Sequence, residues 1–181
     1  VTGDQTLFVD GGTIPANVTG PNRKFAKIAL SVSIGAIQAN VIERPIFLTP
    51  LMFDGSETIM SSGAATTVTS PHAPGVALDI PAGVTTFPNG SSSGLFNMME
   101  ISSKVTSIAP LEFAVPNTVV ALEPSGLKFS QPVKLTLPNI NEFPSGMQVV
   151  IMSKNSIKGI WEIDGVGRVS SDGNSVVTLP G

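Results

Sequence analysis

Glycine and proline recur so often along this chain that they leave little room for long helices. The 181 residues include 18 glycines and 15 prolines, about 18% of the chain, against roughly 12% in an average protein. Proline breaks a helix interior, and glycine destabilises one. We therefore expect short strands joined by turns.

Short apolar stretches with a period of two residues support this expectation. In Ala26 to Ile34, alternate side chains are apolar, which is typical of a half-buried strand. Leu95 to Ala109 is the longest stretch without glycine or proline, and its serine, threonine and valine content favours a strand over a helix. Further strands are predicted at Thr6–Val9, Thr66–Thr69, Val76–Ile80, Val119–Leu122, Val133–Leu137, Val149–Met152, Ile160–Ile163 and Val176–Leu179.

Turn signals separate these strands. Asp164-Gly165 and Asp172-Gly173 have the composition of tight hairpin turns, and Asp10-Gly11-Gly12 indicates another turn. The C-terminal part is therefore predicted to be a meander, with Trp161 and Ile163 on one face of its first strand.

One pattern occurs twice. Val76 to Pro81 reads V-x-L-x-I-P, and Val133 to Pro138 reads V-x-L-x-L-P. A Phe-Pro-x-Gly loop follows each of them, at Phe87 and at Phe143. Two readings stay open: a duplicated strand–loop unit, or a chance repeat of a pattern that is common in β proteins.

The predicted fold is an all-β antiparallel β-sandwich of roughly nine to twelve strands. Residues 53–65 are polar and are interpreted as a linker. Residues 66–181 would form the sandwich, and the N-terminal β segment, 1–52, is too small for its own core and should pack on that domain or on a neighbour. The predicted core consists of Val76, Leu78, Ile80, Leu127, Phe129, Val133, Leu135, Leu137, Trp161 and Ile163.

Composition excludes several functions. The net charge is −3 and only 13% of residues are charged, so the chain lacks the basic stripe that a nucleic-acid partner requires. There is no cysteine, which excludes disulfides and thiolate metal sites. No apolar run is long enough for membrane insertion. The start at Val1, without Met or a signal peptide, predicts a piece of a longer chain.

Candidate catalytic residues have simpler structural explanations. A Ser-His-acid triad would need His72, which lies between Pro71 and Pro74 in a predicted solvated turn. Paired carboxylates could hydrolyse glycosides, but the acids are isolated and several lie in predicted turns: Asp10, Asp54, Asp164 and Asp172. We expect no catalytic residues.

The candidate ligand sites also have simpler structural explanations or lack part of the required motif. Asp54–Glu57 and Asp172-Gly173-Asn174 supply fragments of a calcium site, although turn-forming aspartate explains them better. Gly165-Val166-Gly167 lacks the third glycine of a phosphate loop. Asn17 and Asn89 fit glycosylation acceptors. Phe96, Met98 and Met99 suit a core better than an adaptable binding patch. No cofactor and no metal is expected.

Three motifs carry a family resemblance. Gly75–Gly83 (GVALDIPAG) and Val120–Pro138 (VALEPSGLKFSQPVKLTLP) resemble the ZU domain, a β-sandwich of ankyrins, netrin receptors and the zonula occludens protein. Gly159–Gly173 is similar to the end of ZU-like modules in large bacterial surface and secreted proteins, where a segment like Arg44–Pro50 often lies upstream. The resemblance covers about 66–181 well and 1–52 loosely.

The resemblance implies an interaction or spacer module. Some relatives cleave themselves at a His-Phe-Ser site, but the only histidine, His72, precedes Ala73-Pro74, so that activity does not carry over. We therefore expect a non-catalytic structural or adhesive module of a larger cell-surface or secreted protein. Its partner would be a protein or a neighbouring domain. The alternative is a carbohydrate-binding module that binds a glycan through an exposed Trp161.

Overall fold

The computed structural model of the chain describes residues 2–11, 14, 23–36, 39–42, 46, 48, 50–52, 58–61, 63–101, 116, 118–155 and 157–180. This part is all-β and contains no helix, and so none that could cross a membrane. Its strands are β1 (Gly3–Asp10), β2 (Arg23–Phe25), β3 (Lys27–Ile34), β4 (Pro50–Met52), β5 (Thr58–Ser61), β6 (Thr66–Ser70), β7 (Ala73–Ile80), β8 (Thr85–Thr86), β9 (Ser93–Ile101), β10 (Val119–Glu123), β11 (Lys128–Phe129), β12 (Lys134–Pro138), β13 (Gln148–Lys154), β14 (Trp161–Val169) and β15 (Ser175–Thr178).

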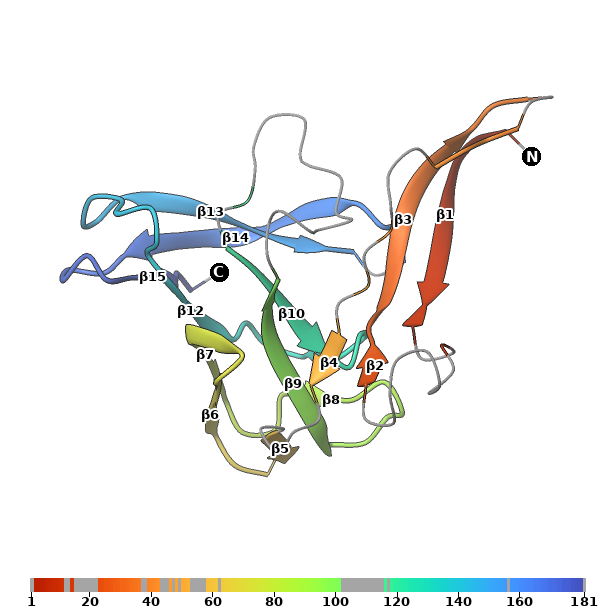
Figure 1. Cartoon of the computed structure of the whole chain (residues 1–181). Helices are drawn as coiled ribbons and strands as arrows, with labels where there is room; N and C mark the ends of the chain where they lie inside the picture. The colour runs from red at the N-terminus through yellow and green to blue at the C-terminus, as the bar shows by residue number, and fades with distance from the viewer. Residues whose placement is uncertain are drawn as a thin grey trace.

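The largest sheet has six strands in the order β13-β14-β15-β12-β7-β6. A three-stranded sheet, β10-β9-β5, crosses the middle of the molecule (Figure 1). The pairs β1–β3, β2–β4 and β8–β11 complete the described sheets, and every pairing is antiparallel. The predicted all-β class is therefore confirmed, with a sandwich-like arrangement.

The core lies where β6 and β7 of the large sheet face β9. Leu78, Phe96 and Met98 are each 1% exposed there. This confirms the prediction that Phe96 and Met98 fill the core. Of the predicted core residues, Val76, Leu78 and Ile80 are buried. The partly buried residues that pack against them include Leu127, Phe129, Val133, Leu135 and Leu137, as predicted.

The predicted C-terminal meander is confirmed only in its second hairpin, β14–β15, because its predicted first and second strands form the single strand β14. The hairpin turn predicted at Asp164-Gly165 is wrong. These residues lie inside β14, where Ile151 pairs with Gly165 and Met152 with Ile163, so that Asp164 is the extra residue of a bulge. The chain reverses earlier instead, where the Asn155 side chain accepts hydrogen bonds from the backbone.

Two predicted core residues of β14 have a different environment. Ile163 is 70% exposed, so its assignment to the core is wrong. Trp161 is only half-buried. The alternation of apolar residues correctly predicts that both side chains lie on one face of the strand. It does not show that this end of the sheet extends beyond the core.

The N-terminal segment contacts the end of the large sheet. In the β1–β3 hairpin, the Thr6 hydroxyl donates a hydrogen bond to the backbone oxygen of Lys158 at 3.5 Å. Gly159 lies so close that a Cβ atom there would be 2.8 Å from the backbone of Leu30. Within the stretch predicted as a linker, Thr58–Ser61 form β5 and pair with β9. The linker prediction is therefore wrong for these four residues, which form a strand. The polar residues around them in the sequence led to that prediction.

The repeated sequence pattern corresponds to two similar local structures. Strands β7 and β12 lie side by side, with Leu78 opposite Leu135. Each is followed by a loop in which a glycine has φ +82°, at Gly90 and at Gly146, a conformation that favours glycine. Phe87 before the first of these glycines is buried, and Phe143 before the second is half-buried.

Candidate functional site

His72 lies in the turn between β6 and β7. Its backbone N–H donates to the Ser70 hydroxyl at 3.1 Å, and its backbone oxygen accepts from Glu100 at 2.8 Å. The Ser70 hydroxyl is thus the acceptor in a turn, and the imidazole is half-buried. Through these hydrogen bonds, Ser70 and the His72 backbone both have a structural role in the turn.

The Asp172 carboxylate organises the turn between β14 and β15. Its oxygens accept from the Ser170 hydroxyl at 2.5 Å and from the backbone and side-chain nitrogens of Asn174 at 3.1 Å each. The Ser170 hydrogen bond, followed by those of Asn174, holds the pKa of Asp172 below its usual value. The turn predicted at Asp172-Gly173 is confirmed, and this carboxylate has a structural role there.

The other predicted candidates are dispersed. Asp10 ends β1, and Asp164 is an exposed bulge residue of β14. Asn89 lies in an exposed turn, where its side-chain oxygen accepts from the backbone of Ser91. Asp54–Glu57 and Asn17 lie outside the described residues. In the described ranges, no three His, Cys, Asp or Glu side chains gather as metal ligands would.

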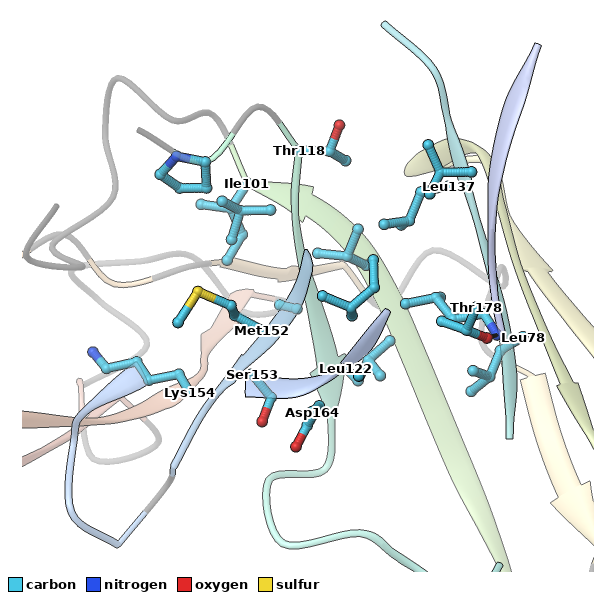
Figure 2. Close-up of a pocket in the computed structure, with 18 of the residues that line it drawn as sticks. Leu78, Ile101, Thr118, Leu122, Leu137, Met152, Ser153, Lys154, Asp164 and Thr178 are labelled. Carbon is cyan, nitrogen blue, oxygen red and sulfur yellow. Dashed lines mark hydrogen bonds between the residues drawn. The ribbon is translucent and has the colours of Figure 1, made fainter. Parts of the chain in front are cut away.

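One concave region of about 1880 Å³ is partly open to solvent. Residues of β9, β10 and β12 to β15 line it, and those of β13 come from both faces of that strand. Figure 2 shows apolar side chains through its middle, with Leu78, Leu137 and Thr178 at one end and Met152 and Lys154 at the other. Trp161 also lines it. The sequence offered no signal for this region, because it depends on how separate strands pack.

Two ionisable groups in the lining of this region are partly desolvated. Burial lowers the pKa of Lys154 below its ordinary value. Burial also raises the pKa of Glu123, and two hydrogen bonds from Ser125 oppose that rise. The Ser125 backbone nitrogen donates at 2.6 Å and its hydroxyl at 3.1 Å. Glu123 therefore has partners for both carboxylate oxygens.

Replacing Glu123 with glutamine should remove a pH dependence of stability. Because the pKa of Glu123 is raised on folding, the folded state binds its proton more tightly. Stability is therefore highest below the unfolded pKa and falls as the pH rises through the folded pKa. Glutamine can keep the hydrogen bond from Ser125. We expect the thermal midpoint of E123Q to match the wild type at pH 4 and exceed it at pH 7. A wild type that gains stability relative to E123Q between these pH values would contradict this.

The β13–β14 hairpin exposes a concentration of apolar side chains. Of the eleven large apolar residues that are more than a third exposed in the described ranges, six lie between residues 147 and 166. Val150 and Val166 are directly opposite each other in the ladder. These six residues, the hairpin surface, are Met147, Val150, Ile157, Ile160, Ile163 and Val166.

Val150 and Val166 of the hairpin surface lie on the side of the sheet away from buried Val176. Val149 and Gly167 form the neighbouring cross-strand pair, and Gly167 packs directly on buried Val176. Since successive side chains of a strand alternate between faces, Val150 and Val166 point the opposite way. The sequence held a signal for this surface, since apolar residues fill consecutive positions from Val149 to Met152 and thus both faces.

Comparisons with protein families, with curated proteins and with solved structures find no match to this chain.

Proposed function

We propose that this chain is a non-catalytic interaction module of a larger cell-surface or secreted protein, with a structural or adhesive role. The observation that carries the proposal is the hairpin surface. A concentration of exposed apolar side chains on one element marks a site of protein association more often than scattered ones do. The partner proposed here is a protein or a neighbouring domain of the same chain.

The surroundings of the hairpin surface suit such an interface. Gln148 pairs with Arg168 at one end, and Lys158 forms an ion pair with Glu162 at 3.2 Å near the other. An apolar centre with a polar rim is the usual composition of a protein interface. In the described sheet, β13 has a neighbour on one side only, so its outer edge is also available for pairing with an extended segment.

The resemblance to ZU-like modules supports the same class of function and the extracellular location. It does not supply a ligand, so the hairpin surface is our basis for choosing a protein partner.

The carbohydrate-binding alternative depended on an exposed Trp161. The side chain is half-buried, so only part of its ring is accessible to a sugar. We favour the protein-binding module because the hairpin surface is the larger exposed apolar feature.

The proposal is tested by immobilising the chain and measuring its binding to a panel of extracellular-matrix proteins and glycans by interferometry. The double variant Ile157→Ser with Ile163→Ser removes two apolar side chains that are 74% and 70% exposed. We expect at least one protein ligand, and we expect the double variant to weaken its binding about tenfold or more, because two apolar contacts are lost.

The matched control is Val41→Ser with Ile42→Ser. These residues are 76% and 47% exposed and belong to the connection between β3 and β4 rather than to the hairpin, so binding should be unchanged. Binding to glycans alone, or an equal loss in both double variants, would contradict the proposal.

A further inference from the structure

The outer edge of β13 carries backbone groups that no strand of the described sheet pairs. β13 is the seven-residue end strand of the large sheet, and β14 is its only neighbour there (Figure 1). It contains neither proline nor glycine, and its one charged residue is Lys154 at its end. Proline, charges or short length usually protect an edge strand from pairing with another chain. β13 has little of this protection, so its edge can accept a further strand.

Two hydrogen bonds at the ends of β13 show which of its backbone groups point outward. The N–H of Val169 donates to the Met147 oxygen at 2.9 Å, and the N–H of Asn155 donates to the Ile160 oxygen at 2.8 Å. In an antiparallel pair, residues that bond to the partner alternate with residues that point away from it. The odd-numbered residues of β13 therefore face β14. The residues with outward N–H and C=O groups, which no hydrogen bond from a described residue reaches, are Gln148, Val150, Met152 and Lys154.

The same even-numbered residues carry their side chains on one face of the sheet. Val150 lies on the face away from buried Val176, and side chains two residues apart on a strand share a face. A strand added at this edge would place alternate side chains beside them. This face has two apolar cross-strand pairs in its middle and a cation near each end. The pairs along it are Gln148–Arg168, Val150–Val166, Met152–Ile163 and Lys154–Trp161.

The two cations of this face, Lys154 and Arg168, form no ion pair with a described residue. Glu162 is on the other face and pairs with Lys158 at 3.2 Å. Asp164 is an exposed bulge residue that pairs with neither cation. The charge that this part of the face offers to a partner is therefore positive, on a chain with a net charge of −3. Acidic side chains on an added strand complement it.

We propose that the partner of the hairpin surface binds through an extended acidic–apolar segment, which adds to the outer edge of β13 as an antiparallel strand. Two alternate apolar side chains of the segment lie beside Val150 and Met152. Acidic side chains at its ends lie beside Lys154 and near Arg168. Every described pairing is antiparallel, and this arrangement is slightly more stable than the parallel one. The inference rests on the proposed function, since it names the chemistry by which the partner is recognised.

The edge strand of a second copy is a poorer occupant than such a segment. β13 contains no acid, so a second β13 would bring another Lys154 and no carboxylate to this edge. We therefore expect the chain alone to sediment as a monomer at micromolar concentrations.

The test is a titration of the chain with a fluorescein-labelled synthetic peptide, followed by fluorescence polarisation. The peptide alternates threonine and valine between two terminal glutamates, Glu-Thr-Val-Thr-Val-Thr-Glu. We expect saturable binding at micromolar concentrations. The counterpart with lysine at both ends should bind about fivefold more weakly or less, because two attractive charge pairs become repulsive.

Methylation of the peptide backbone distinguishes strand addition from contact through side chains alone. In the antiparallel register, the valine N–H groups point to β13 and the threonine N–H groups point away from it. N-methylation of both valines should abolish measurable binding. N-methylation of two threonines is the matched control, and it should leave the affinity within about twofold, because no hydrogen bond to β13 is lost.

The variant that tests the charges is Lys154→Gln with Arg168→Gln. We expect it to weaken binding of the glutamate peptide about fivefold and to leave binding of a glutamine-ended peptide unchanged. The matched control is Lys27→Gln with Lys128→Gln, on exposed lysines of β3 and β11. The exchange of peptide charges tests the same contacts on the unaltered chain, whatever the variant does to folding.

Four results would overturn the proposal. They are the absence of saturable binding of the glutamate peptide, equal affinity for the lysine-ended peptide, equal effects of the two methylation patterns, and a dimer of the chain alone. The protein panel and the Ile157 and Ile163 variants test the proposed function separately. A protein ligand that these variants weaken, and that the glutamate peptide does not displace, would overturn the acidic–apolar segment and leave the protein interface standing.

Discussion

The Phe96→Ala variant should lose about 3–5 kcal/mol of the free energy of unfolding, as expected when a buried aromatic ring is removed from a close-packed core. Phe96 is 1% exposed on β9 and belongs to the cluster that joins this strand to Leu78 of β7. A domain of this size has about 5–15 kcal/mol of total stability. The change therefore removes a large share of it, which urea unfolding followed by circular dichroism would measure.

The control for this variant is Phe8→Ala. Phe8 is 50% exposed on β1, and its ring contacts the Lys27 ammonium group. Such an exposed cation–π contact contributes about 0.5–1 kcal/mol, so we expect a loss of about 1 kcal/mol. Equal losses in the two variants would show that β9 does not form the centre of the core.

The Gly167→Ala variant should lose about 1–3 kcal/mol, because it inserts a methyl group where there is no space. A Cβ atom on Gly167 would lie 2.6 Å from Cγ1 of Val176 and 3.4 Å from Cδ1 of Ile151. Val176 is 6% exposed, so its short branched side chain has little room to move. Thermal unfolding of the purified variant would measure the effect.

Gly165→Ala is the matched control, two residues away on the same strand. A Cβ atom there would meet nothing within 4 Å, and we expect stability within about 0.5 kcal/mol of the wild type. The reverse order of the two effects would contradict the packing of Gly167 against Val176.

Sequence reasoning succeeded where one local pattern determines the structure. The alternation in Val76–Ile80 and Val133–Leu137 predicted strands, and these became the adjacent strands β7 and β12. The turn at Asp172-Gly173 followed from its composition. Asp164-Gly165 has the same composition, yet it forms a bulge, because pairing with β13 continues through it. Pairing between strands is non-local and overrides turn propensity at such positions.

The candidate sites were harder to predict for the same reason. Whether Ile163 or Trp161 faces the core depends on how far the sheet extends past β9, which no local pattern reports. The concave region and the partial burial of Lys154 depend on how separate strands pack, which no local pattern reports. Phe96 and Met98 were predicted as core residues correctly, because large apolar side chains in a strand without glycine or proline are usually buried.

Hydroxyl-radical footprinting tests most directly whether the hairpin surface binds a protein partner. The chain is labelled alone and in complex with the tightest protein ligand of the panel, and side-chain oxidation is compared by mass spectrometry. We expect protection at Met147, Ile157 and Ile163, with Phe8 and Ile42 oxidised equally in both states. Unchanged oxidation at Met147, Ile157 and Ile163, with protection elsewhere on the surface, would contradict the assignment of this hairpin as the interaction surface.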